Sequence, residues 1–465
     1  MTNETTICAP ATPAHGALAL VRVSGPDCFA VVDRIFEPAG KKGTLGDAPG
    51  NTIHFGIIRA PEGALDEVLV SVFKGPHSYT GEDSAEISCH GSPYIMQRIQ
   101  ELLLEAGALP AKPGEFTQRA FLNGKMDLSQ AEAVADLIAA ESEGAHRVAL
   151  QQLRGGFSDA LKELRNRLLQ FISLVELELD FSEEDVEFAD RTQLRALVAE
   201  IRTLVSDLTD SFRLGNVLKN GVPVAIVGRP NVGKSTLLNA ILKEDRAIVS
   251  DVAGTTRDTI EDTLNIDGIT FRFIDTAGIR ETAEAIEKLG IRRTYQKIES
   301  ASIVLLLVEA DDSPALINET VAALRNQMEG QSKELVLLLN KAEGWEPSRL
   351  EKLRDEVRGM ERERILALSA REGQVNELTR LLLDLVNLGQ IKHRDVIISN
   401  IRHMNALRAA LESLLRVEEG LETDLPTDLL AQDIRETLHY LGEITGEVTT
   451  DEILGNIFRN FCIGK

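Results

Sequence analysis

The stretch "VAIVGRPNVGKSTLLNAIL", Val224–Leu242, decides the fold of the middle of the chain. A short apolar run leads into a loop of the form G-x-x-x-x-G-K-[ST], Gly228 to Ser235, and a helix-like run follows. In this order the loop's backbone N–H groups close around a β-phosphate, and the helix N-terminus favours the negative charge. The stretch therefore predicts a P-loop nucleotide site in an α/β domain.

The surrounding sequence repeats the pattern of an apolar run followed by a polar loop. The runs are "VAIVG", "FRFID", "IVLLLVEA" and "LVLLLNK". Continuous apolar strands that alternate with helices indicate a parallel sheet covered on both faces. The loops "GTTRD" (254–258), "DTAGIRE" (275–281), "NKAE" (340–343) and "SARE" (369–372) are expected at one edge of this sheet, where open α/β folds bind ligands.

These loops supply the predicted nucleotide ligands. Lys234 is expected to bridge the β- and γ-phosphates, while Ser235 and Thr256 offer hydroxyls to Mg²⁺. Asp275 is expected to hold Mg²⁺ through water, and the Gly278 N–H to sense the γ-phosphate. The full predicted set is Asn231, Val232, Gly233, Lys234, Ser235, Thr236, Ser250, Thr255, Thr256, Asp275, Thr276, Ala277, Gly278, Asn340, Lys341, Glu343, Ser369, Ala370 and Arg371.

The base-reading loop departs from the usual pattern. The motifs resemble those of translation-factor-class GTPases, in which this loop reads N-K-x-D, but its last residue here is Glu343. A carboxylate at this position accepts both N1–H and N2–H₂ of guanine, which adenine cannot offer. The extra methylene of glutamate shifts the carboxylate by about 1 Å and weakens the bidentate geometry. We expect selectivity for guanine with reduced affinity.

The sensor loop lacks a polar side chain for the attacking water. In switch GTPases the residue after the glycine of this loop is polar and orients the water, but here it is Ile279. The next stretch, "GIRETAEAIEKLG", offers Glu281, Glu284 and Glu287, and a carboxylate can orient water. The residues alone do not choose among the three.

Length and composition limit the class of protein. The chain has 465 residues, enough for two or three domains, and a net charge of −23. This charge argues against a protein whose main surface binds nucleic acid. If RNA is the substrate, another subunit is expected to supply much of the electrostatic binding. The four cysteines form no CxxC pair, so we expect neither disulfides nor structural zinc. We expect a cytoplasmic protein with no membrane segment and no signal peptide.

The pattern of apolar residues along the chain predicts a multidomain α+β and α/β protein. Residues 1–120 mix strand-like and helix-like runs, and 121–215 carry helical apolar stripes. Residues 216–384 hold the P-loop α/β pattern, and helical stripes return over 385–465. Helical segments on both sides of the α/β domain predict that it is inserted into one helical domain.

Five further strings carry a resemblance to a known family. They are "ALVRVSG", "YTGEDSAEI", "KPGEFTQRAFLNGKMDLSQAEA", "GEITGE" and the terminal "FCIGK". Together with the nucleotide motifs, they resemble the MnmE (TrmE) family of tRNA-modification GTPases over essentially the whole chain. The resemblance implies that Glu287 is the catalytic carboxylate and that G domains associate face to face. It also implies a K⁺ site, formed by Asn231, Ser250, Val252 and Thr255.

The resemblance also implies the purpose of hydrolysis. Family members form homodimers and, with the FAD-binding protein MnmG, heterotetramers that add an aminomethyl or carboxymethylaminomethyl group at C5 of the wobble uridine in certain tRNAs. The methylene comes from a tetrahydrofolate derivative, the 5-formyl or methylene form, bound by the N-terminal dimerisation domain. The positions that match folate contacts are Arg22, Glu82, Lys125 and Lys465.

Cys462 and the function itself leave alternatives open. Cys462 is either a buried apolar residue or a nucleophile or proton-transfer group beside the folate and the uridine. The competing functions are a ribosome-assembly or signalling switch without its own chemistry, and a folate-binding protein with a vestigial GTPase. The intact set of Lys234, Ser235, Thr256 and Asp275 argues against the vestigial GTPase.

Overall fold

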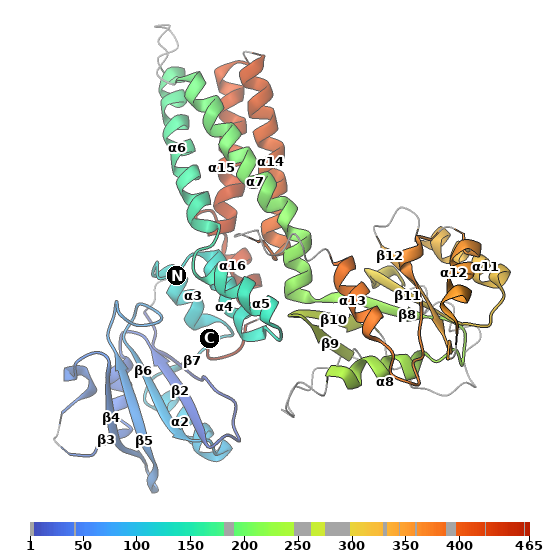
Figure 1. Cartoon of the computed structure of the whole chain (residues 1–465). Helices are drawn as coiled ribbons and strands as arrows, with labels where there is room; N and C mark the ends of the chain where they lie inside the picture. Colours follow the sequence, from blue (N-terminus) through green and yellow to red (C-terminus); the bar gives the residue numbers. More distant parts are fainter. Residues whose placement is uncertain are drawn as a thin grey trace. The chain divides into compact units, whose positions relative to one another are not determined.

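The chain consists of two compact units (Figure 1). The computed structural model describes residues 4–40, 43–180, 190–245, 262–274, 298–328, 333–343, 345–358, 360–386, 397–423, 425–459 and 461–465. Unit 1 comprises Met1–Ala139, Ala149–Thr209 and Ile401–Lys465; unit 2 comprises Ala140–Val148 and Asp210–Asn400. Unit 2 is therefore inserted between parts of unit 1.

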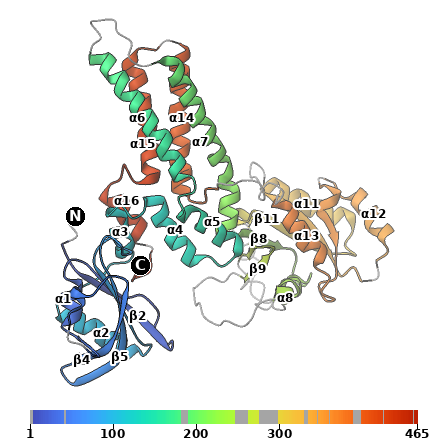
Figure 2. The ribbon, with the colours of Figure 1, turned by 60° about the vertical axis from the view of Figure 1, so that its left-hand side comes forward.

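Unit 1 begins with a seven-stranded sheet of order β3-β4-β5-β6-β2-β1-β7. Its strands are β1 (Ile7–Pro10), β2 (Leu18–Ser24), β3 (Phe36–Pro38), β4 (Thr52–Ala60), β5 (Gly63–Phe73), β6 (Ser84–His90) and β7 (Leu109–Pro110). All neighbouring strands are antiparallel except β1 and β7. Helices α1 (Cys28–Asp33) and α2 (Pro93–Glu105) pack on one face, over alternate residues such as Val21, Val70 and Ile87 (Figure 2). This alternation is typical of a sheet with one buried face.

The rest of unit 1 is helical. Its helices are α3 (Glu115–Leu122), α4 (Leu128–Ala139), α6 (Ser158–Asp180), the first part of α7 (Arg191–Asn220), α14 (Ile401–Glu422), α15 (Thr427–Thr445) and α16 (Asp451–Phe458). Helices α6, α14 and α15 run side by side (Figures 1 and 2). Their contacts bury residues at helical spacing, such as Leu161 and Leu168 in α6 and Ile434 and Leu441 in α15. The helical structure predicted from the spacing of the apolar residues is confirmed here.

Unit 2 contains a six-stranded sheet of order β13-β12-β11-β8-β10-β9. Its elements are β8 (Val222–Val227), α8 (Lys234–Asp245), β9 (Asp262–Ile266), β10 (Ile269–Phe273), β11 (Ile303–Glu309), α11 (Pro314–Gln327), β12 (Glu334–Asn340), α12 (Pro347–Glu356), β13 (Ile365–Ala367) and α13 (Asn376–Leu385). Neighbouring strands are parallel except in the β9–β10 hairpin.

Both faces of this sheet are buried. Leu305 and Leu307 of β11 pack with the α8 and α13 side, whereas Val304 and Leu306 pack with Ile317 on the α11 side. Two buried faces explain why the strands read as continuous apolar runs. The predicted fold class, an N-terminal α+β domain, a helical domain and an inserted P-loop α/β domain, is confirmed.

One segment of the predicted helical domain packs in unit 2 and not with the helices of unit 1. Helix α5 (Glu143–Leu153) begins in residues 140–148, which belong to unit 2 although the predicted helical domain spans 121–215. The Gly144 N–H donates to the Gly268 carbonyl at 3.2 Å, and Val148 joins the core of unit 2. The four predicted domain ranges otherwise stay a prediction. No helix in the described part of the chain is long and apolar enough to cross a membrane.

Two leucines of α14 provide a test of the helical core. Leu407 is 0% exposed and Leu415 is 48% exposed. We expect Leu407→Ala to lower the free energy of unfolding by about 3 kcal/mol, since it leaves a cavity, and Leu415→Ala by less than about 1 kcal/mol. Urea unfolding of unit 1, followed by helical circular dichroism, measures the difference. Equal losses in the two variants would contradict the burial described here.

Candidate functional site

The P-loop joins β8 to α8, and its own lysine binds two main-chain carbonyls of the loop. The Lys234 ammonium donates to the carbonyls of Gly228, at 2.8 Å, and Arg229, at 2.7 Å. The Leu237 N–H donates to the Gly233 carbonyl at 2.9 Å, which begins the helix directly after the loop. The loop thus brings a lysine and a helix N-terminus together, the arrangement that binds phosphate.

Gly233 permits the close approach of this loop to β12. Its φ is +100°, and a Cβ there would lie 2.3 Å from Nδ2 of Asn340. Asn340 is buried and donates from Nδ2 to the Val232 carbonyl at 2.8 Å. Its Oδ1 accepts from the Ala370 N–H at 3.0 Å. One buried amide therefore fixes the P-loop, the NKAE loop and the SARE loop to one another.

Glu343 is held by the SARE loop. Its Oε1 accepts from the Ser369 hydroxyl at 2.7 Å, and the Glu372 N–H donates to the same hydroxyl at 3.2 Å. The Ser369 hydrogen bond lowers the pKa of the exposed Glu343, and the charges of Arg371 and Lys341 add to the effect. The carboxylate is thus an ionised acceptor, as guanine recognition requires.

Part of the predicted site lies outside the described residues. The residues concerned are Ser250, Val252, Thr255, Thr256, Asp275, Thr276, Ala277, Gly278 and Glu287. Their predicted roles stay predictions. Among the described ones, Asn231 and Thr236 are exposed and Val232 is buried, and Asn231 has a φ of +64°.

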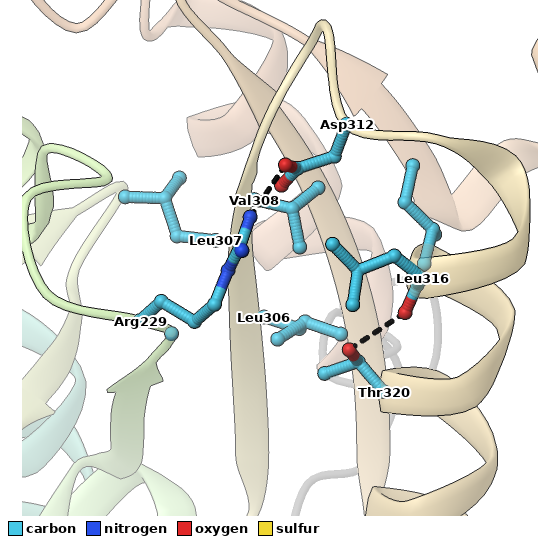
Figure 3. Close-up of a pocket in the computed structure, with 9 residues that line it drawn as sticks. Arg229, Leu306, Leu307, Val308, Asp312, Leu316 and Thr320 are labelled. Atoms are coloured by element: carbon cyan, nitrogen blue, oxygen red, sulfur yellow. Dashed lines mark hydrogen bonds and ion pairs between the residues drawn. The ribbon is translucent and has the colours of Figure 1, made fainter.

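A small hollow lies beside the P-loop but is not the nucleotide site. Figure 3 shows Arg229 reaching Asp312, with which it forms an ion pair, over side chains such as Leu306 and Leu316. The space in this partly open hollow, about 20 Å³, suits one water molecule and is far too small for a nucleotide. The hollow is a packing gap between β11 and α11.

In unit 1 the C-terminal segment docks on the N-terminal sheet. Arg22 of β2 donates from Nη1 to the Gly464 carbonyl at 3.1 Å and from Nε to Glu86 at 2.9 Å. Its guanidinium lies over the ring of Tyr79, 5.3 Å from the centroid. Gly464 has a φ of +92°, and a Cβ there would meet the Pro10 carbonyl at 2.1 Å. Only glycine fits this approach.

Glu82 has a buried partner that the sequence did not reveal. Its Oε2 lies 3.2 Å from Arg119 Nη1 and accepts from the Ser24 hydroxyl at 2.9 Å. The side chains of Arg119 and Glu82 are 5% and 11% exposed. The one local signal for Arg119 was Glu115, four residues earlier on α3, with which it also pairs at 2.9 Å.

The other predicted residues of this region lie at the surface. Lys125 is exposed and donates to the Pro76 carbonyl at 2.8 Å, while the Lys465 N–H donates to the Cys462 carbonyl at 3.3 Å. The structure brings Arg22 to the C-terminal segment but shows no contact between Glu82 and Lys125 among the described residues.

Of the two alternatives for Cys462, burial as an apolar residue is wrong, because the side chain is exposed. The other three cysteines are buried, and burial raises the pKa of Cys8 and Cys89 to about 11. Cys462 is therefore the accessible cysteine of the four. Its role in catalysis stays a prediction.

Comparison with known proteins decides the family. The model of the MnmE helical domain matches residues 128–462, and that of the GTP-binding protein TrmE N-terminus matches residues 6–125. The tRNA modification GTPase MnmE of Bacteroides thetaiotaomicron is 52% identical over 466 residues, 100% of both chains. That of Christiangramia forsetii is 53% identical over 472 residues, 99% of each. The chain belongs to the MnmE family.

The resemblance deduced from the sequence is thereby confirmed. MnmE relatives are tRNA modification GTPases, and a P-loop GTPase binds GTP together with Mg²⁺. The parts of such a site that the structure describes are the Lys234 loop and the NKAE and SARE loops held by Asn340. Among solved structures, an Era variant of Aquifex aeolicus bound to GDP and AlF₄⁻ is 25% identical over 41% of this chain and 66% of its own, with a TM-score of 0.27.

The contact between Ser369 and Glu343 allows a test of guanine recognition in this MnmE chain. Ser369→Ala removes the donor that holds the carboxylate, and we expect the affinity for GDP to fall about tenfold. The native chain should bind GTP far more tightly than ATP. Titration with fluorescent nucleotides measures both, and Ser348→Ala on the exposed side of α12 is the control. Comparable binding of ATP and GTP would refute the assignment of Glu343.

Proposed function

We propose that the chain couples K⁺-dependent, dimerisation-activated GTP hydrolysis to the modification of the wobble uridine at C5 in certain tRNAs. The added group is aminomethyl or carboxymethylaminomethyl, its methylene comes from a tetrahydrofolate derivative, and the FAD-binding protein MnmG is the partner. The observation that carries the proposal is the docking of the Phe461–Lys465 segment on the N-terminal sheet, where Arg22 meets the Gly464 carbonyl at 3.1 Å. A site for one-carbon transfer at this place would lie on the same polypeptide as the GTPase site.

The nucleotide end of the proposal rests on the P-loop. Lys234 neutralises and orients the phosphates, and Ser235, at the start of α8, offers its hydroxyl to Mg²⁺. Asn231 is exposed with a φ of +64°, so its amide oxygen is accessible to a cation outside the loop. K⁺ held there, with Ser250, Val252 and Thr255, would supply the positive charge that other GTPases take from an arginine.

Water orientation falls to a carboxylate because Ile279 has no hydrogen-bonding side chain. We assign this role to Glu287, the residue that matches the catalytic position of the MnmE family. A carboxylate that accepts from the attacking water orients it towards the γ-phosphate and draws off its proton. Face-to-face association of two G domains would order Glu287 and the K⁺ ligands together.

The N-terminal sheet supports a homodimer. On the face opposite α1 and α2, large apolar side chains are exposed: Leu18 by 70%, Ile53 by 66%, Phe55 by 50% and Leu69 by 45%. Phe55 and Leu69 lie directly opposite each other in the β4–β5 register. Soluble proteins seldom expose a group of such residues unless another surface covers it. We infer that a second copy does so, and that the dimer binds MnmG as a heterotetramer.

The folate would lie on the same face of the sheet, beside Arg22. Arg22, Lys125 and Lys465 are cations suited to its glutamyl carboxylates, and Glu82 is a carboxylate suited to the pterin N–H groups. Arg119 would act through Glu82, because it holds that side chain in place. The exposed Cys462 is then available as a nucleophile or as a proton-transfer group towards the uridine.

The GTPase half of the proposal predicts dependence on the cation and on Glu287. We expect GTP turnover to fall at least 100-fold when Na⁺ replaces K⁺ at constant ionic strength, since the charge at the phosphates is lost. Glu287→Ala should cause a loss of about 100-fold or more, because the water is no longer oriented. Steady-state phosphate release measures both, with Glu281→Ala and Glu284→Ala as controls. Full activity in Na⁺ would contradict the K⁺ site.

The modification half predicts a separate phenotype for Cys462→Ser. We expect this variant to keep full GTP turnover and to lose the modified wobble nucleoside, because serine is a far weaker nucleophile than a thiolate. Nucleoside analysis of tRNA from cells that lack the chain and carry the variant measures it. Ile463→Val, at the exposed neighbouring residue, is the control. An unchanged nucleoside profile in cells without the chain would favour the ribosome-assembly switch instead.

A further inference from the structure

Helix α4 packs against the C-terminal segment. Leu128 and Ala131 form a buried cluster with Leu454, Phe458 and Phe461. The rings of Phe458 and Phe461 are 5.1 Å apart at their centroids. Since Phe461 directly precedes Cys462, a shift of α4 acts on the residue that anchors the terminal segment.

Helix α4 also carries a buried charged cluster. Glu132, 7% exposed, lies 2.6 Å from Nε2 of His403 and accepts from Nε of Arg402 at 2.8 Å. His403 is 0% exposed. Arg402 also donates to the carbonyl of Ile444, near the end of α15, at 3.2 Å. One carboxylate on α4 therefore fixes this helix to the beginning of α14 and the end of α15.

The cluster has the hydrogen bonds that burial demands at Glu132 and lacks one at His403. Burial alone would raise the pKa of Glu132, but His403 and Arg402 outweigh it and hold the pKa at about 2. The contact of 2.6 Å requires Nε2–H of His403 to donate to the carboxylate. Nδ1 of His403 has no hydrogen-bond partner among the described residues. Such a cluster tolerates few arrangements, since removing one partner leaves a buried charge uncompensated.

The cluster also joins helices that end or begin at two of the four places where the chain passes between the units. Helix α4 ends at Ala139, where residues of unit 2 begin, and α14 starts at Ile401, directly after unit 2 ends. Within unit 2, the Gly144 N–H binds the Gly268 carbonyl of the β9–β10 turn. Strand β10 leads into the sensor loop that begins at Asp275. The segment that leaves α4 is thus attached to the β9–β10 hairpin, whose second strand precedes the sensor loop in the sequence.

We propose that α4 is the mechanical link by which the nucleotide state of unit 2 repositions the Phe461–Lys465 segment, with Glu132, Arg402 and His403 as its positioning residues. This inference rests on the proposed function, in which that segment serves the modification. The ion cluster makes α4, α14 and α15 move as one body, and the contact of Phe461 with α4 carries the movement to Cys462. Packed cores change between discrete arrangements rather than deform continuously, which suits a switch.

The test uses the reactivity of the Cys462 thiol in the full chain. The three other cysteines are buried, so a thiol reagent reports mainly on Cys462. In the native chain with K⁺ and Mg²⁺, we expect the reaction rate to differ at least threefold between GDP and GDP with aluminium fluoride. Glu132→Gln and His403→Leu should abolish this difference and lower the modified nucleoside at least fivefold. Both should leave GTP turnover within twofold.

Two further variants separate positioning from general stability. His403→Gln keeps a donor for Glu132, and we expect it to restore the nucleotide-dependent thiol response. Glu178→Gln breaks another buried ion pair of unit 1, with Arg191 at 2.5 Å, but does not involve α4, and should keep the response. A normal response in folded Glu132→Gln and His403→Leu, or its loss in Glu178→Gln, would overturn the link. A native chain that supports no modification would refute the proposed function alone, because the thiol response does not require tRNA.

Discussion

The nucleotide unit depends on the side chain of Asn340. This buried amide donates to the Val232 carbonyl and accepts from the Ala370 N–H, so it fixes the phosphate loop and both base loops in one geometry. The contact is possible only because Gly233 has no Cβ to meet the amide. An unpaired amide in this place would cost about 1 to 3 kcal/mol, which is a large part of the stability of a domain. The position of Glu343 follows from the same constraint, because Ser369 stands next to Ala370.

A comparable contact organises the other end of the protein. Arg22 binds a main-chain carbonyl of the terminal segment, and Gly464 lets that segment lie against Pro10. In both places, a polar side chain joins segments that are far apart in the sequence, and a glycine allows them to meet. Helix α4 contacts both the terminal segment and, through Glu132, the charged cluster. The chain therefore relies on few polar contacts to position segments that have little apolar surface of their own.

The sequence predicted the strands of unit 2 and the P-loop because their signals are local. The apolar runs are buried on both faces, and the motif fixes the order of strand, loop and helix. It failed where partners come from distant segments. Nothing near Glu82 indicates Arg119, which lies 37 residues away, and residues 140–148 read as ordinary helix although they pack in unit 2. The exposure of Cys462 likewise depends on where Gly114 and Gly464 hold the terminal segment.

The net charge of −23 has a consequence for how tRNA is held. In unit 1, Arg22, which contacts the terminal segment, is already paired with Glu86 at 2.8 Å, and Arg119 is paired with Glu82 and Glu115. A paired, partly buried guanidinium contributes little to binding a phosphate backbone, which depends on exposed cations that release counterions. Under the proposed function, this chain would supply the chemistry at the base and a partner would supply most of the binding to the tRNA backbone.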